Sequence, residues 1–263
     1  TLSTLLELSR AGRHAASDHL ETAALAGVLT VGCRRCGGGL AGEVAVSNVL
    51  EGVEVALRHD PELLVLDGSG AALPPVAAGR RVLVAGASQD PVVATGYLNA
   101  YRHLLADLVV VTMAEEGAPH EELAQRSRGL VRPGVPVLRA VLRPHPAAPI
   151  SGRTVAFFGT APASQHARIA AHLEELGAHV AHVSGSLADR AALRAELAAV
   201  EAEVFLVELK AAAVDVVAEE GAARGVEIVL AANDVVALPG EPDLDTELAR
   251  LAAEAVEAVE ALA

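Results

Sequence analysis

The chain has 263 residues and a mass of 26.8 kDa, long enough to bury one large α/β core or two smaller ones without disulfides. Its 20 Lys and Arg residues against 34 Asp and Glu give a net charge of −14, which argues against binding to nucleic acid or to an anionic membrane. Aromatic residues make up 2% of the chain and tryptophan is absent, so surfaces for base stacking are also excluded.

Short β-branched runs alternate with helical patterns in the first half, which is typical of βαβ units with parallel strands. Between the first two strands, Glu43–Arg58 has its apolar residues on one face, which predicts a helix packed on a sheet. The predicted strands are Val28–Gly32, Leu63–Leu66, Arg81–Gly86, Leu108–Thr112 and Val137–Leu142.

Residues 143–153 hold three prolines and a glycine, a composition that resists regular structure and predicts a linker. We therefore expect a first domain over residues 1–148 and a second over 149–263.

The alternation resumes after this segment and predicts a smaller α/β domain, with its first helix capped by Ser164. Its predicted strands are Thr154–Phe158, His179–Val183, Ala202–Leu209 and Val226–Ala231. Its other predicted helices are Asp189–Val200, Ala211–Arg224 and Leu244–Ala263.

The run LLVLDGSG is a predicted strand that ends in Asp67 and a Gly-Ser-Gly turn. Ligands of open parallel sheets gather at the carboxyl ends of the strands. Asp67 is therefore a candidate Walker-B-type acid, although a plain turn explains the same residues.

The segment VGCRRCGGGLAGE follows a predicted strand and precedes a predicted helix. Helix N-termini attract anions, and arginine offers paired donors that match phosphate and carboxylate. Arg34 and Arg35 beside Gly37, Gly38 and Gly39 therefore predict a site for a multiply charged small anion. The alternative is an exposed arginine pair on a flexible loop.

Cys33 and Cys36 form a C-x-x-C motif with three possible roles: structural, zinc-binding or redox. His14 and His19 supply two further ligand types, but five residues of helix turn the second about 140° away from the first. The lack of a disulfide framework or secretory leader predicts a cytoplasmic protein.

Lys210 is the single lysine among the 20 basic residues. Its retention in an arginine-rich chain suggests a function, and chance is the alternative.

Several motifs together resemble the cyclic 2,3-diphosphoglycerate synthetase family. They occur in the family's order over residues 1–235 and are HAASDHLETA, VGCRRCGGGLAGE, SNVLEGVEVA, LDGSGAALPP, GYLNAYRHLLADLVVVTMAEE and VELKAAAVDV. The resemblance implies ATP-dependent closure of 2,3-diphosphoglycerate into a ring with an internal phosphoanhydride, with release of ADP and phosphate. It also implies an α/β fold with a P-loop NTPase-like parallel sheet, distantly similar to dethiobiotin synthetase, and a second, smaller Rossmann-like domain.

The resemblance assigns roles to particular residues. Arg34, Arg35, the three glycines and Ser69 would bind substrate, Lys210 and Asp67 would act in catalysis, and Asp67 with Asp18 would hold Mg²⁺. Thr112, Met113 and Arg143 would contact the nucleotide. A homodimer is expected.

Two departures from the family pattern matter. No G-x-x-x-x-G-K-[ST] phosphate loop occurs in the sequence, so the first strand and phosphate loop of the fold are missing from it, and residue 67 is Asp where we expect Glu. Either a region upstream supplies that loop, or this is a truncated form without ATP turnover. A non-catalytic protein that binds an anionic metabolite and a dethiobiotin-synthetase-like ligase stay open as alternatives.

Overall fold

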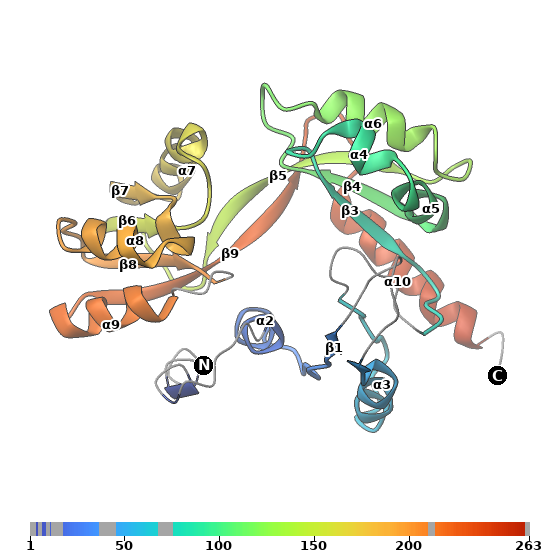
Figure 1. Ribbon diagram of the computed structural model, residues 1–263, viewed down its shortest axis with the longest axis horizontal. Helices are drawn as coiled ribbons and strands as arrows, with labels where there is room; N and C mark the ends of the chain where they lie inside the picture. The colour runs from blue at the N-terminus through green and yellow to red at the C-terminus, as the bar shows by residue number, and fades with distance from the viewer. Residues whose placement is uncertain are drawn as a thin grey trace. The chain divides into compact units, whose positions relative to one another are not determined.

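The computed structural model describes residues 18–36, 46–67, 76–209 and 214–260, together with positions 4, 7, 8 and 11 (Figure 1). The fold is α/β, as predicted. Contacts divide the chain into two compact units. Unit 1 comprises Thr1–Gly32 and Arg143–Asp234, and unit 2 comprises Cys33–Leu142 and Val235–Ala263. Unit 2 thus includes the C-terminal helix, so these units group the chain differently from the expected domains, whose limits at 148 and 149 stay a prediction.

Unit 2 contains a parallel sheet whose middle strand is buried on both faces. Val109 and Val111 pack on one face with Leu123 of a helix, whereas Leu108 and Val110 pack on the other with the C-terminal helix. The strands are β3 (Val82–Gly86), β4 (Leu108–Thr112) and β5 (Val137–Pro146). The helices are α4 (Pro91–Thr95), α5 (Leu98–Leu105), α6 (His120–Arg128) and α10 (Leu244–Glu260).

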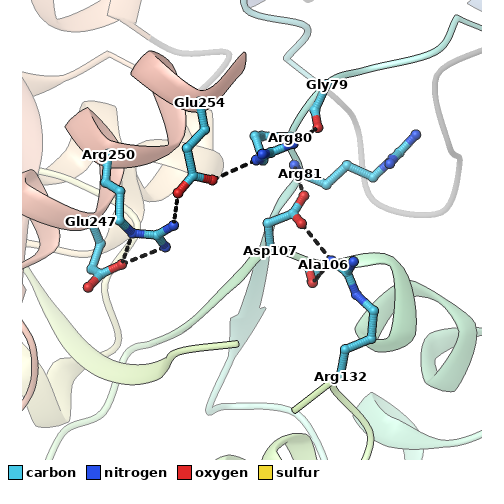
Figure 2. A network of polar contacts seen from close by, with 9 residues as sticks. All are labelled: Gly79, Arg80, Arg81, Ala106, Asp107, Arg132, Glu247, Arg250 and Glu254. Carbon is cyan, nitrogen blue, oxygen red and sulfur yellow. Dashed lines mark hydrogen bonds and ion pairs between the residues drawn. The ribbon is translucent and has the colours of Figure 1, made fainter. Parts of the chain in front are cut away.

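A chain of ion pairs fastens α10 to the beginning of β3 (Figure 2). Glu254 accepts from Arg80 at 2.8 Å and from Arg250 at 2.6 Å. Beside this chain, Asp107 accepts the backbone N–H of Arg81 at 2.8 Å and also pairs with Arg132. Charged contacts therefore close the amino edge of the β3–β4 pair.

Unit 1 contains a second parallel sheet in the order β7-β6-β8-β9. Its two central strands are apolar on both faces and separate two cores, one around Phe158 and Phe205 and the other around Phe157 and Leu206. The strands are β6 (Thr154–Phe158), β7 (His179–Ser184), β8 (Val204–Glu208) and β9 (Glu227–Ala237). The helices are α2 (Asp18–Ala26), α7 (Ala163–Glu175), the 3₁₀ turn η2 (Ser186–Ala188), α8 (Arg190–Leu197) and α9 (Val214–Arg224).

The predicted linker is partly wrong, because residues 143–146 continue β5. Strands β5 and β9 run antiparallel: Ala147 donates to Leu230 in unit 1, and Leu238 donates to Arg139 in unit 2. The N–H of Ala147 points toward β9, so the prolines at 144 and 146 face away from it and cost no ladder hydrogen bond.

Two predicted strands of the first half are not formed. Residues 28–32 and 63–66 have no strand partner, and Val65 is 76% exposed. The Gly-rich segment also differs from expectation, because β1 (Arg35–Cys36) pairs antiparallel with β2 (Val46–Ser47), and α3 begins only at Val49 (Val49–Leu57). A hairpin thus replaces the expected turn from strand to helix.

The remaining predicted elements agree with the structure to within a few residues, except that β9 continues six residues beyond the predicted end at Ala231. The cap of α7 is wrong, because Pro162 precedes this helix and no side chain caps it. Asp189, which was expected within a helix, caps α8 by accepting from Ala191 and Ala192. None of the helices in the described part of the chain is long and apolar enough to cross a membrane.

Candidate functional site

The sheet of unit 1 has a topological switch point, where connections from neighbouring strands run in opposite directions. Of the four strands of this parallel sheet, β6 comes first in sequence. The second, β7, lies on one side of it, and the third, β8, lies on the other. Loops that leave the carboxyl ends of β6 and β8 therefore diverge, and open α/β sheets bind ligands at such a switch point.

Glu208 ends β8 at this switch point and joins three strand ends. One carboxylate oxygen accepts the backbone N–H of Thr160 at 2.9 Å and its hydroxyl at 3.2 Å. The other accepts from Asn233 Nδ2 at 2.7 Å. Thr160 follows β6 and Asn233 lies in β9, so one side chain ties together the carboxyl edge of the sheet.

Gly159 makes the close approach of Glu208 possible. A Cβ at this position would lie 2.6 Å from Phe157 Cε1 and 3.0 Å from the Glu208 oxygen that accepts from Thr160. A larger residue would therefore push the turn away from the carboxylate.

An open hollow of about 330 Å³ lies beside the same turn, between the ends of β6 and β7. Glu196 lines it and accepts from Ser186 Oγ and from His182 Nε2 at 3.0 Å. Burial opposes ionisation of Glu196, but hydrogen bonds from Ser184, Ser186 and His182 outweigh it and hold the pKa of this carboxyl below its ordinary value. The hollow has both polar and apolar lining residues and lies next to the switch point.

The carboxyl edge of the unit 2 sheet carries two of the predicted nucleotide contacts. Thr112 is buried, and its carbonyl accepts the N–H of Ala87, which follows β3. Met113 is 45% exposed with φ 56°, and Ser88 Oγ lies 3.6 Å from its sulfur. The structure thus brings the ends of β3 and β4 together, whereas the half-buried Arg143 belongs to unit 1.

The other predicted residues are placed less fully. Arg34 is exposed, and its backbone pairs with Asn48 just before β1. Asp67 is exposed at the end of an irregular segment. Asp18 begins α2 in unit 1, whereas Asp67 belongs to unit 2, so the two-acid magnesium site stays a prediction.

Several predicted residues lie outside the described residues: Gly37, Gly38, Gly39, Ser69, Lys210 and His14. Only the backbones of Arg35 and Cys36 are described, in β1. Cys33 is an exposed thiol, and His19 lies against Gly32. No three His, Cys, Asp or Glu side chains are grouped around a possible metal position within the described ranges. The three roles considered for the cysteines stay open.

Sequence reasoning missed Glu208, Thr160 and Asn233. Glu208 had the same signal as Asp67, an acid that ends an apolar strand, and it lies two residues before Lys210 in VELKAAAVDV. Its partners are 48 and 25 residues away, and nothing local in the sequence points to them.

The chain was compared with known proteins. The family model of the cyclic 2,3-diphosphoglycerate synthetase P-loop domain matches residues 1–137, and that of the C-terminal domain matches 146–234. Three curated relatives bear the name cyclic 2,3-diphosphoglycerate synthetase. The protein of Rubrobacter xylanophilus is 52% identical over 94% of this chain and 56% of its own length. That of Thermococcus gammatolerans is 42% identical over 90% and 54%, and that of Methanosphaera stadtmanae is 37% identical over 96% and 56%.

The chain thus spans about half the length of the curated relatives it matches. The model of the P-loop domain covers more than half of the chain, and the matched regions contain the motifs that first suggested the resemblance. The chain belongs to the cyclic 2,3-diphosphoglycerate synthetase family.

Proposed function

We propose that the protein is an ATP-dependent ligase that closes 2,3-diphosphoglycerate into its cyclic phosphoanhydride. The carrying observation is the match of both family models along the chain, with relatives of up to 52% identity that bear the synthetase name. Support from the structure comes from two parallel sheets whose carboxyl edges carry polar side chains.

The proposed reaction has two steps. ATP transfers its γ-phosphoryl group to an oxygen of one substrate phosphate, which gives a phosphoanhydride and ADP. An oxygen of the neighbouring phosphate then attacks the inner phosphorus in line and expels inorganic phosphate, which closes the ring. Both groups lie on one three-carbon skeleton, so the protein mainly has to position them and offset their repulsion.

Residue roles follow the family motifs. Catalysis is assigned to Lys210 and Asp67, and nucleotide contacts to Thr112, Met113 and Arg143. The groups proposed to bind substrate are Arg34, Arg35, Gly37, Gly38, Gly39 and Ser69. Asp67 and Asp18 offer hard carboxylate oxygens, which suit Mg²⁺. This ion would supply positive charge to the phosphates.

The proposal extends to organisation. Residues 1–148 would serve nucleotide and substrate binding and 149–263 would form the C-terminal domain, in a cytoplasmic homodimer. Exposed apolar side chains on β3 and just before α5, such as Val84 at 62% and Tyr97 at 88%, support association. Light scattering on the purified chain tests the dimer.

Phosphorus NMR tests the reaction. We expect ATP and 2,3-diphosphoglycerate to give ADP, phosphate and a cyclic product in a magnesium-dependent manner, with the Rubrobacter xylanophilus protein as the positive control. Intact mass spectrometry of the protein from its native source establishes whether a phosphate loop precedes the sequence. Product from the control and none from the native protein would contradict the proposal.

A further inference from the structure

The hydrogen bonds of Glu208 do not need a negative charge. Its three donors are a backbone N–H, a hydroxyl and a side-chain amide, all neutral. A glutamine in this place would satisfy the same partners, with its oxygen toward Thr160 and its NH₂ toward the oxygen of a flipped Asn233 amide. These three hydrogen bonds therefore do not require the negative charge of the carboxylate.

No positively charged side chain within the described residues pairs with Glu208. A partly buried carboxylate without a cation loses hydration and gains no ion pair in return. Glu203, which precedes the other end of the same strand, differs in that positive charge lies near it. It accepts from Thr154 N at 2.7 Å, and Arg153, whose ion pair is with Glu227, donates to the backbone carbonyl of Glu203. The hydrogen bond from Thr154 and then the charges of Arg153 and His179 lower the pKa of Glu203.

The uncompensated charge lies at the switch point, where a ligand of this sheet is expected. We infer that Glu208 is a positioning residue for the proposed reaction: its carboxylate fixes the turn at Gly159 and Thr160, and its charge balances a cation that the bound substrate brings into place. This inference rests on the proposed function. The cation is a divalent metal that accompanies the phosphates.

Whether Glu208→Gln weakens or strengthens substrate binding distinguishes this role from a purely structural one. Near a substrate with several negative charges, removal of a carboxylate relieves repulsion and should leave affinity unchanged or improve it. If Glu208 instead holds a cation, Glu208→Gln should raise the Kd of 2,3-diphosphoglycerate with Mg²⁺ about 10- to 150-fold. Calorimetry on the full chain measures this, and Glu203→Gln is the matched control with wild-type affinity.

A second titration tests the identity of the cation. Wild type and Glu208→Gln should bind 2,3-diphosphoglycerate equally when Mg²⁺ is replaced by EDTA. A loss of affinity in Glu208→Gln that persists in EDTA would contradict a metal partner for this carboxylate.

Urea unfolding without ligand tests the inference separately from the function. Glu208→Gln should unfold at the wild-type urea concentration or higher, whereas Glu203→Gln should unfold at a lower one. A drop for Glu208→Gln equal to that of Glu203→Gln would show that the chain already balances this charge, which overturns the inference even if the enzyme is active. A wild-type chain that binds no substrate while this difference persists would contradict the proposed function alone.

Discussion

The amino edges and the carboxyl edges of the two parallel sheets carry different polar contacts. At the amino edges, carboxylates meet guanidinium groups: Asp107 pairs with Arg132, and Glu227 pairs with Arg153 at 2.6 Å. At the carboxyl edges, Glu208 meets neutral donors, and Ser88 meets the sulfur of Met113. The amino edges hold the fold together, whereas the carboxyl edges leave charge and hydrogen-bonding capacity for a ligand.

The largest effect is expected from substitution of Lys210, which follows the carboxyl end of β8 in sequence. Lys210→Ala should lower kcat about 100- to 1000-fold, since one donor to a transition state contributes ~2.7–4 kcal/mol. Lys210→Arg should recover little, because a planar guanidinium does not replace a compact ammonium. Steady-state kinetics decide, and full activity in Lys210→Arg would remove the lysine from the proposed chemistry.

Asp107→Ala probes the amino edge of unit 2. The substitution leaves the N–H of Arg81 without its acceptor and separates Arg132 from its carboxylate, so stability should fall by about 1–3 kcal/mol. Substrate affinity measured below the unfolding transition should stay at the wild-type value. Urea unfolding and calorimetry give the two numbers, and Arg132→Ala should show part of the stability loss. Lost affinity with unchanged stability would break the distinction between the edges.

His103 ties stability to pH near the same amino edge. It is 1% exposed, and its ring contacts the carbonyl of Asn99 at 2.8 Å and Ser127 Oγ at 3.0 Å. Burial lowers the pKa of His103, against a smaller opposing effect of the Asn99 contact. The unfolded chain therefore binds a proton first as pH falls, and stability should decrease below about pH 6.5, by at most ~1.4 kcal/mol per pH unit.

Urea unfolding at pH 8, 6.5 and 5 measures this dependence. His103→Gln should flatten it, whereas the exposed His145→Gln should leave it in place. An equally steep dependence in His103→Gln would assign the effect to another group.

The smallest expected effect belongs to Glu254, a partly exposed member of the chain of ion pairs in Figure 2. Hydrogen bonds from Arg80 and then Arg250 lower its pKa. Its contribution is present above the ordinary glutamate value and is lost as pH falls below it. Glu254→Gln should shift the urea midpoint slightly at low salt and not in about 1 M salt, where exposed pairs are screened. A shift larger than that of Asp107→Ala would reverse the order of the two contacts.

The elements that the sequence predicted best are those that packing buries on both faces. Leu108–Thr112 and Thr154–Phe158 form strands with the predicted bounds because their side chains pack on both sides of a sheet. The run Leu63–Leu66 is equally apolar but has no strand partner in the structure. Composition indicates that a segment is suited to a strand, and only pairing makes it one.

Strand β5 shows the opposite error. Prolines at 144 and 146 suggested a linker, yet both face away from β9 in the antiparallel pair, where a missing N–H has no effect. The candidate site also combines a part that the sequence predicts with a part that it does not. The strand that ends in Glu208 could be predicted from its apolar run, but the three donors that converge on this residue depend on contacts between distant parts of the chain.

The antiparallel pair of β5 and β9 has a consequence for folding. Arg139 and Leu238 lie roughly 100 residues apart in sequence, so β5 and β9 can pair only after the long stretch of chain between them has been made. Contacts of such long separation slow folding and make it cooperative. Each unit also takes part of both strands, so a fragment cut at residue 148 would leave β9 with an unpaired edge, which is prone to aggregation.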